Sequence, residues 1–565
     1  MKSFLRKAFE TQLAEARLAT QAATGKCGRT SWLTSTILLV TLIVLLAVAS
    51  TANAASRYAV QNGNWNSTTV WSATSGGSSG ASIPVTGDDV FIEEASNGRT
   101  VTIPTGYRAA CTSLTMGNEA AAVAGALNFN NSTSSLAVSG NVVMNRPGGA
   151  ATTTINLAAG SMTVGGNLEL AHHTATSAAV SRINRVSVST GTLTVSGDLI
   201  FGAEAAAQSQ IVFSSTGRVN LAGAFTLSNR LGTLTPSTGT VNFNGAAAQT
   251  IPIGVSSVGY NNVLLNNTSA SGAIISAAIT GSGTNQVIGN LSVQSGTFDN
   301  GGLAISLASG KSFSVSNGAT FKLTGTTSSM VSVSGGGTIT FGASSTVNYA
   351  GTTQTVTTAT YGNLTISSGT KTFTSPMTIA GTLALDSSSV VSPDSGSSYT
   401  AHALPIGGVL KVAESWGNTG AGAASINPTH FADTGLLNVN TGAVDAAQSV
   451  SSPAIASITA NGSSTQVITE QARDINKNFT IGGSTMLISK SSGTGSLDGT
   501  ENNGKGTYTA TVTSPKMAGS GTFTATTEWG LSMMTILFVG VALWDSIRSR
   551  KNRRQSPFQS KQDMN

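Results

Sequence analysis

Histidine is the side chain best suited to acid–base or metal chemistry near neutral pH, and this chain has only four. His172 and His173 stand together in "AHHTAT", which lacks the third ligand and the glutamate that a zinc enzyme would need. His402 and His430 stand alone, outside any Ser/His/Asp pattern. We therefore expect four exposed histidines in turns, with no catalytic or metal-binding role.

Acidic residues are sparse, and only two pairs of carboxylates are adjacent: Asp88 with Asp89, and Glu93 with Glu94. Asp88 and Asp89 are weak candidates for a calcium site; the alternative is that Asp88 fixes a turn before a strand over residues 90–92. A polysaccharide lyase or hydrolase would need carboxylates or basic residues that converge in space. The sequence shows no such constellation, so we expect no enzyme activity and no cofactor.

Cysteine contributes little. Cys27 lies before the first apolar run, so Cys111 is left without an internal disulfide partner in an exported chain. We expect Cys111 to be a small buried residue, and the exported part to depend on β packing for its stability.

The composition is unlike that of an ordinary globular enzyme. Charged residues make up 9% of the 565 residues, hydrophobic residues 39%, and there are 65 glycines; about 25% charge is typical of globular domains. The net charge of +6 is concentrated at the ends: residues 1–54 carry +4, residues 528–565 carry +3, and residues 55–527 carry −1. Because a nucleic-acid-binding domain needs a basic face, we expect no nucleic-acid partner.

Residues 1–54 have the three parts of a secretory signal. A long basic region precedes the apolar run "WLTSTILLVTLIVLLAVAS", and Ala52 and Ala54 supply the small residues of a cleavage site before Ala55. This pattern predicts a signal helix, export by the secretion machinery and removal by signal peptidase. The alternative is an uncleaved signal anchor, since the run could nearly span a bilayer.

The middle of the chain is repetitive. "LAVSGNV" at residue 136 recurs as "MTVGGNL" at 162, "LTVSGDL" at 193, "VNLAGAF" at 219 and "MTIAGTL" at 377. Alternation with period two indicates strands, and a repeat of 20–50 residues indicates a solenoid. We predict an all-β fold whose residues 55–400 form a right-handed parallel β-helix (β-solenoid) rod. A string of small β-sandwiches is the competing architecture, but the repeat is too short for it.

A longer repeat overlays the short one. "TVNFNGAAAQTI" begins at residue 240 and "TVNYAGTTQTV" at 346, and each is followed by a Tyr-Asn-Asn or Tyr-Gly-Asn segment. The Asn of the Gly-Asn-Leu pieces (Asn167, Asn290 and Asn363) could form internal ladders between coils, or could simply favour turns.

The opening of the rod, "NGNWNSTTVWSATSGGSSGASIPVTGDDVFI" from residue 62, resembles that of large secreted bacterial β-helix proteins of the adhesin and haemagglutinin type. The resemblance implies an opening cap segment over residues 58–117. The open end of a solenoid exposes core and strand edges, so we expect Trp65 and Trp71 to cap it. A sugar-stacking role for these tryptophans is the alternative.

Residues 453–527 contain alternating runs at 465–469, 485–489, 507–513 and 522–526, which predict a β-sandwich. With "ITANGSSTQVIT", "ARDINKNF" and "GKGTYTATVTS", the segment resembles the Ig-like repeats of invasins and intimins and the filamin-type sandwich. That resemblance implies one rigid spacer or adhesive-tip module. Residues 401–452 would close the rod or connect it to this module, with Trp416 and Phe431 as core plugs.

The C-terminus, residues 528–554, has a motif, an apolar run over 531–544 and a basic cluster. The motif is Glu528, Trp529 and Gly530. The layout resembles the exosortase-type sorting signals of Gram-negative bacteria (PEP-CTERM or IPTL-like), although the prefix here is "TATT". By the positive-inside rule the run is expected to be a transmembrane helix with a cytoplasmic basic end, cleaved by an exosortase-type enzyme or retained as an anchor. Residues 555–565 are expected to be a disordered tail. The basic residues are Arg548, Arg550, Lys551, Arg553 and Arg554.

Together these features predict an exported cell-surface protein in the cell envelope. A β-helix rod on an Ig-like stalk would be held or sorted by a single-pass membrane segment, and its structural or adhesive role would involve extracellular glycans, matrix or other cells. The alternative is a surface carbohydrate-active enzyme on a β-helix scaffold.

Overall fold

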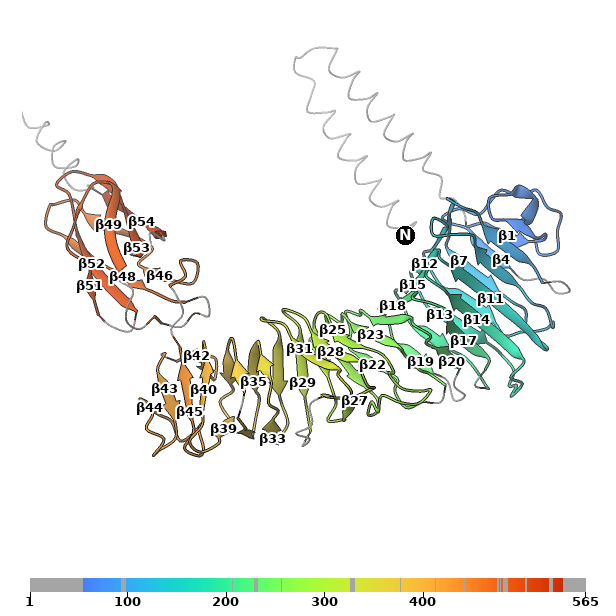
Figure 1. Ribbon diagram of the computed structural model, residues 1–565. Coiled ribbons are helices and arrows are strands. Elements are labelled where there is room, and N and C mark those ends of the chain that lie inside the picture. Colours follow the sequence, from blue (N-terminus) through green and yellow to red (C-terminus); the bar gives the residue numbers. More distant parts are fainter. Residues whose placement is uncertain are drawn as a thin grey trace, which may run out of the picture. The chain divides into compact units, whose positions relative to one another are not determined.

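The computed structural model describes residues 54–92, 98–205, 207–227, 232–255, 257–325, 331–375, 377–411, 413–440, 444–474, 477, 479–480, 486–503, 506–526 and the backbone of 527 and 532–541. Within these ranges the only helix is the short 3-10 turn η1 (Thr68–Val70), and every other element is a strand (Figure 1). The predicted all-β class is confirmed. The expected signal helix falls in residues 1–54, of which only residue 54 is described.

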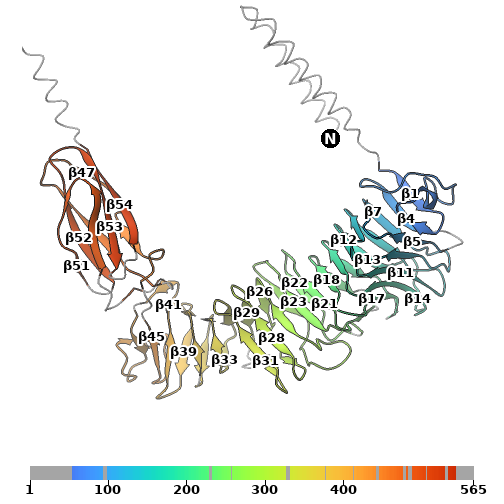
Figure 2. The same cartoon turned by 45° about the horizontal axis from the view of Figure 1, so that its top comes forward.

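Most strands belong to long sheets whose neighbours are parallel and one coil apart in sequence. This is the hydrogen-bonding pattern of a β-solenoid, and the strands stack side by side in both views (Figures 1 and 2). The first sheet contains, in spatial order, β3 (Trp71–Ser72), β1 (Ser56–Ala59), β4 (Asp89–Ile92), β7 (Ser113–Met116), β10 (Val142–Asn145), β13 (Leu168–His172), β16 (Leu199–Phe201) and β19 (Phe225–Leu227). The second contains β2 (Gly63–Asn64), β5 (Thr100–Ile103), β8 (Ala126–Phe129), β11 (Ala151–Ala158), β14 (Arg182–Val188), β17 (Ser209–Phe213) and β20 (Thr233–Thr235).

Two further sheets continue the stack. The third contains β6 (Arg108–Cys111), β9 (Ser135–Val138), β12 (Ser161–Val164), β15 (Thr192–Val195), β18 (Arg218–Leu221), β21 (Thr240–Phe243), β23 (Asn262–Leu265), β25 (Leu291–Val293), β28 (Ser312–Val315) and β31 (Thr338–Phe341). The fourth contains β22 (Gln249–Ile251), β24 (Ala273–Ile275), β26 (Thr297–Asp299), β29 (Thr320–Leu323), β32 (Thr346–Tyr349), β35 (Asn363–Ile366), β38 (Leu383–Leu385), β41 (Pro405–Ile406) and β42 (Val409–Leu410). Smaller sheets join β27 (Ile305–Leu307) to β30 (Val331–Val333), β33 (Thr353–Val356) to β36 (Thr370–Phe373) and β39 (Val390–Pro393), and β34 (Thr360–Tyr361) to β37 (Thr378–Ile379).

The short sequence repeat marks equivalent positions of successive coils. Leu136, Met162, Leu193 and Val219 are aligned in parallel register, and their side chains are buried. The repeat glycine allows close approach between coils: a Cβ added to Gly197 would lie 2.6 Å from the carbonyl carbon of Gly166. The period-two alternation therefore predicted the strands correctly, and in the structure its apolar positions face the core.

The asparagines of the repeat connect neighbouring coils. The Oδ1 atom of Asn167 accepts a hydrogen bond from the backbone N–H of Asp198 at 2.8 Å, and Asn290 and Asn363 accept equivalent bonds from Ser312 and Thr382, both at 2.9 Å. These side chains therefore link neighbouring coils, as the first of the two alternatives held, but they bond to the main chain at partly exposed corners and do not stack inside the core.

The longer repeat is explained by a buried glutamine. Gln249 Oε1 accepts a hydrogen bond from Gly245 N at 2.8 Å, and Gln354 Oε1 accepts one from Gly351 N at 3.0 Å. Each amide also donates to a carbonyl of an earlier coil, that of Leu221 for Gln249 and that of Leu323 for Gln354. The two copies of the motif thus build the same inward-facing turn.

One hydrophobic core extends along the solenoid from Ala59 to Val439. Beyond residue 400, β40 (Ser398–Ala401), β45 (Leu436–Val439), β43 (Ser415–Gly417) and β44 (Ser425–Ile426) form a mixed four-stranded sheet. Trp416 and Phe431 are buried in this part of the core. Residues 401–439 therefore share the core of the solenoid.

Residues 444–541 form a separate module of two sheets. One contains β46 (Val450–Ser452), β48 (Thr465–Gln471), β52 (Thr507–Thr513) and β50 (Ser496–Leu497), with β51 (Glu501–Asn502) also paired to β52. The other contains β47 (Ile455–Thr459), β54 (Ser532–Val541), β53 (Gly519–Thr527) and β49 (Met486–Gly493). Ile468 and Val512 of one sheet share a core with Ile488 and Phe523 of the other, as expected for a sandwich. The four predicted strands are present as β48, β49, β52 and β53.

The apolar run near the C-terminus is not a transmembrane helix in this structure. Residues 532–541 form β54, which is antiparallel to β53 and parallel to β47. Methionine, isoleucine, phenylalanine and valine are compatible with a strand, and pairing with both neighbours satisfies the backbone groups of residues 537–540. Among the described residues, no helix is long and apolar enough to cross a membrane.

Candidate functional site

The two predicted calcium ligands are engaged in local contacts. Asp88 is buried, its Oδ2 accepts a hydrogen bond from Val85 N at 3.1 Å, and the Nε atom of Arg57 lies 3.8 Å from the same oxygen. Asp89 lies on β4 and accepts a hydrogen bond from Ser113 Oγ at 2.5 Å. The contacts of Asp88 are those of a turn-fixing residue. Within the described ranges no cluster of His, Cys, Asp or Glu side chains could hold a metal ion.

Trp65 and Trp71 lie fully buried at the N-terminal end of the solenoid core. Their rings meet edge to face with centroids 5.1 Å apart, and Trp71 Nε1 donates to the carbonyl of Trp65 at 2.7 Å. Neither ring face is open to solvent, so the geometry does not favour sugar stacking. The capping role remains a prediction, which these contacts support.

A cluster of charged side chains lies in the loops that connect strands of the first sheet to strands of the second. Loops of four successive coils, at residues 117–125, 146–150, 173–181 and 202–208, are stacked there. We call its members Glu119, Arg146, His173, Thr174 and Glu204 the loop cluster.

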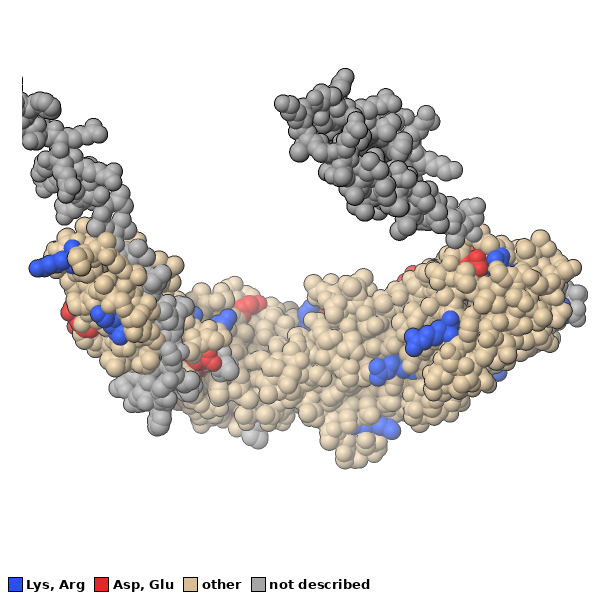
Figure 3. Space-filling view, turned by 90° about the horizontal axis from the view of Figure 1, so that it is seen from above, with Lys and Arg blue, Asp and Glu red and all other residues tan. Residues whose placement is uncertain are grey.

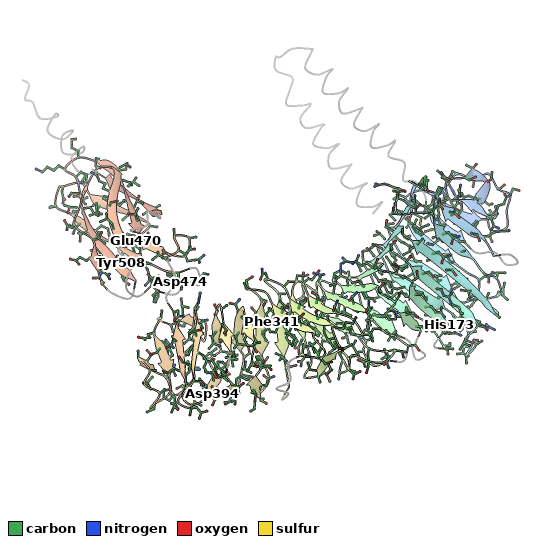
Figure 4. All side chains as sticks on the ribbon, in the orientation of Figure 1. His173, Phe341, Asp394, Glu470, Asp474 and Tyr508 are labelled. Atoms are coloured by element: carbon green, nitrogen blue, oxygen red, sulfur yellow. The ribbon has the colours of Figure 1, made fainter. Side chains whose placement is uncertain are left out.

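The members of the loop cluster bind one another across coils. Glu119 accepts hydrogen bonds from Thr174 N at 2.6 Å and Thr174 Oγ1 at 2.7 Å, and its Oε1 lies 3.7 Å from Arg146 Nη2. His173 Nε2 lies 2.8 Å from Glu204 Oε1 and its Nδ1 lies 2.8 Å from the carbonyl of Ala171. Figure 4 shows the position of His173 on the solenoid. These contacts link the loops of all four coils, and the bonds between Glu119 and Thr174 span two coils.

The partners of Glu119 in the loop cluster stabilise its ionised form. Burial alone would raise the pKa of Glu119, but the hydrogen bonds from Thr174 and the nearby Arg146 charge lower it overall. Arg146 is almost completely buried, and burial lowers the pKa of its guanidinium. Its Nη2 donates to the carbonyl of Ala175, whereas Nε and Nη1 have no hydrogen-bond partner among the described residues.

The network does not resemble a hydrolytic site. A glycosidase needs one carboxyl group free to donate a proton and a second to act as base or nucleophile. In the loop cluster, Glu119 is held in its ionised form and Glu204 is paired with His173. The geometry therefore provides no support for the carbohydrate-active alternative, and Figure 3 shows few charged side chains on the face it presents.

The expectation of exposed turn histidines is only partly met. His402 is exposed, but the side chain of His173 is only 16% exposed, and His430 Nδ1 lies 2.8 Å from the carbonyl of Ser389. His172, at the end of β13, lies 2.9 Å from Glu169 Oε1. The sequence offered no means of recognising Glu119, Arg146 or Glu204, because the members of the loop cluster lie up to 85 positions apart in the chain.

A hollow of about 410 Å³ lies where the second sheet ends at β20. Beyond this strand the regular sheet is replaced by isolated parallel β-bridges, which pair Leu234 with Val258 and Tyr260 with Val287. Among the residues that the structure describes, the lining carries no charged side chain: it consists of Thr233, Leu234, Thr235, Pro236, Ser257, Gly283, Thr284, Gln286 and Ile288. Hydroxyl and amide groups over an apolar floor suit a neutral polar ligand.

The module of residues 444–541 has one buried acidic side chain opposite an aromatic one. Glu470 on β48 is in register with Tyr508 on β52, and both are buried (Figure 4). Ser451 Oγ donates a short hydrogen bond to Glu470 Oε1. Burial raises the pKa of the Glu470 carboxyl, partly offset by this bond.

Several predicted functional residues lie outside the described part of the chain. Ala54 and Ala55 are described, whereas Ala52 is not. The motif Glu528, Trp529 and Gly530 is not described, and the same holds for the basic cluster of Arg548, Arg550, Lys551, Arg553 and Arg554. Their predicted roles in cleavage, sorting and stop-transfer stay predictions. Cys111 is described, and it is a buried free cysteine as expected.

Comparison with known proteins bears on the C-terminal module. No curated protein matches this chain. A solved structure of the adhesin InvE from Yersinia pseudotuberculosis is 26% identical over the matched part, which covers 17% of this chain and 27% of that chain, with a TM-score of 0.15. The match therefore spans about a quarter of the length of that adhesin. The family model for invasin domain 3 matches residues 445–536. This stretch begins at the module's first residues and ends within β54, so the two-sheet module is similar to the third domain of invasin.

Proposed function

We propose that this chain is an exported cell-surface protein with an adhesive role. The observation that carries the proposal is the match of residues 445–536 to invasin domain 3, which coincides with a folded two-sheet module. The solenoid supports the same function, because a rod of parallel coils presents long lateral faces for binding. In this proposal the rod is a right-handed β-helix, the module is Ig-like, and the signal is cut between Ala54 and Ala55.

The partners we propose are extracellular glycans, matrix or other cells. The hollow beside β20 is the part of the rod best suited to a neutral sugar unit, because the described residues of its lining supply hydroxyl and amide groups and no ionised side chain. The loop cluster is a less suitable contact, since its charges are already paired with one another.

Attachment of a display strain tests the adhesive role. The full chain is expressed in a non-adherent bacterium, and binding to epithelial cells, matrix proteins and a glycan panel is compared with the empty strain. We expect increased attachment, and loss of most of it when residues 56–440 are deleted with the module retained. Equal binding by the two strains on all three surfaces would refute the proposal.

A pair of point variants tests the hollow. Thr284→Lys places a charge in its exposed lining, whereas Ser282→Lys places the same charge on an exposed neighbour outside that lining. If the hollow binds glycan, only the first variant lowers attachment. Equal effects of the two variants would remove the hollow from the proposal.

The processing of the ends is proposed on sequence grounds alone. An exosortase-type enzyme and signal peptidase would act on the C-terminal and N-terminal segments respectively. Mass spectrometry of the surface-exposed protein identifies both mature ends. Peptides beyond Arg548 in that material would exclude C-terminal cleavage before the basic cluster.

A further inference from the structure

The segment of residues 532–541 has two possible environments. In the structure it is strand β54, in register with β53 at eight positions and with β47 at five. The sheet order β47-β54-β53-β49 makes it an interior strand. The same segment, SMMTILFVGV, carries no charge and is followed by the five basic residues at 548–554, a sequence that favours retention in a bilayer during export.

The two environments make competing demands on one set of backbone groups. In the sheet, residues 532–540 of β54 are paired with β53, and residues 537–541 are paired with β47 as well. In a bilayer core there is no water to satisfy them, so the segment would have to form a helix with bonds inside itself. A backbone group used in one ladder is not available for the other.

Loss of β54 would also open the module. β47 is the terminal strand of its sheet, and β54 is its neighbour there. β53 would keep β49 on one side and lose its partner on the other. The match to invasin domain 3 ends at residue 536, within β54, which supports assigning this strand to the module.

We propose that closure of the C-terminal module and membrane insertion of residues 532–541 are mutually exclusive states of this chain. Insertion of the segment leaves β47 and β53 with an open gap between them; docking of the segment into that gap removes the chain's C-terminal hold on the bilayer. The module is therefore complete only in molecules whose residues 532–541 have left the membrane. This inference is independent of what the rod binds.

A cross-strand disulfide tests the proposal on the full chain. Thr522 and Leu537 are in register on β53 and β54, so Thr522→Cys with Leu537→Cys can form a disulfide only when β54 is docked. The matched control, Thr522→Cys with Ile536→Cys, shifts the second thiol by one residue and onto the opposite face. Both pairs are placed in a Cys27→Ser, Cys111→Ala background. After oxidation, chains are divided into carbonate-extractable and carbonate-resistant membrane fractions.

We expect the in-register pair to cross-link about tenfold more than the control in the extractable fraction, and to remain as free thiols in the resistant fraction. Equal cross-linking in the two fractions would overturn mutual exclusivity. Equal yields of the two cysteine pairs in the extractable fraction would overturn the assignment of β54. Because the assay measures no attachment, its failure is distinct from failure of the adhesive proposal.

A second variant set is designed to shift the equilibrium from membrane insertion toward docking of β54, with no substitution in the strands of the sheet. Replacing Arg548, Arg550, Lys551, Arg553 and Arg554 by glutamine removes the charge that holds the segment at the cytoplasmic side. The cross-linked share of the total chain should rise. An unchanged or lower share would show that the membrane does not compete with the module for this segment.

Discussion

The solenoid and the C-terminal module bury polar groups by different routes. In the solenoid, Gln249 and Gln354 bond to main-chain atoms of their own turn and of a preceding coil, and Gln249 also accepts a hydrogen bond from Asn267 Nδ2 at 2.9 Å, so these bonds join adjacent coils. In the module, strands far apart in sequence are paired, as β48 is with β52. Damage should therefore remain local in the solenoid and spread through the whole module.

Each region also contains a buried ionisable group whose pKa is shifted by burial, a lysine in the solenoid and a glutamate in the module. Lys371 is fully buried in the solenoid, where Nζ donates to the carbonyls of Gly351 at 2.7 Å and Ser368 at 2.5 Å. Burial lowers the pKa of Lys371 and raises that of Glu470. The folded solenoid binds the Lys371 proton less tightly than the unfolded chain, so its stability should rise as the pH increases toward the ordinary lysine pKa of about 10.4. The stability of the module should instead fall as the pH increases above the ordinary glutamate pKa of about 4.3.

The largest effect is expected from Phe523→Ala in the module. Phe523 is fully buried, and removal of a core phenylalanine costs about 3–5 kcal/mol. Because a small sandwich unfolds cooperatively, hydrogen exchange should speed up in all its strands together and leave the solenoid unchanged. Leu487→Ala, at a side chain 58% exposed, is the control and should change little. Faster exchange confined to β53 would contradict the contrast between the two regions.

Trp71→Ala should have a similar cost but a local consequence. Its ring is buried beside Trp65, so about 3–5 kcal/mol is again expected. In a stacked array the loss should fall on the nearest coils. Hydrogen exchange should speed up in β1 and β4 and stay unchanged in β32, while the exposed control Val85→Ala has no effect. Uniform acceleration along the solenoid would show that it unfolds as one unit.

A pH-dependent difference is expected for Glu470→Gln. The folded module holds the carboxyl proton more tightly than the unfolded chain, so its stability is greatest below the unfolded pKa of about 4.3. It should fall as pH rises through the folded pKa, by at most about 1.4 kcal/mol per pH unit. Denaturant titrations at several pH values should show this slope in the parent and its absence in the variant. If the free energy of unfolding fell with pH equally in the parent and the variant, the pH dependence would come from a group other than Glu470.

The smallest effect is expected from Asn242→Ala, at a buried position of β21 between the core residues Val241 and Phe243. Asn242 Nδ2 donates to Asn220 Oδ1 at 2.9 Å, and its own Oδ1 accepts from Asn266 Nδ2 at 2.9 Å. Loss of each such bond costs about 1 kcal/mol. Hydrogen exchange should change only in β18, β21 and β23, with Thr240→Ala on the same strand as control. An effect as large as that of Trp71→Ala would mean that this ladder, rather than the core, holds the coils together.

The sequence alone determined the architecture wherever one residue position repeats. Leu136, Met162 and Leu193 alternate with polar neighbours at a coil-length interval, and a parallel stack is the arrangement that buries all of them. The four strands predicted in the module follow from the same alternation. Local periodicity is sufficient in these cases because each residue's partners are its equivalents one repeat away.

Only the tertiary structure decided the features that depend on distant residues. The loop cluster joins Glu119, Arg146 and Glu204 from separate coils, and no local pattern marks them. The apolar run at residues 532–541 met the sequence criteria for a short membrane segment, yet it pairs with β47 and β53. Hydrophobicity determines that such a segment is buried away from water. Where it is buried depends on the position between β47 and β53, and β47 begins 86 residues before the end of β54.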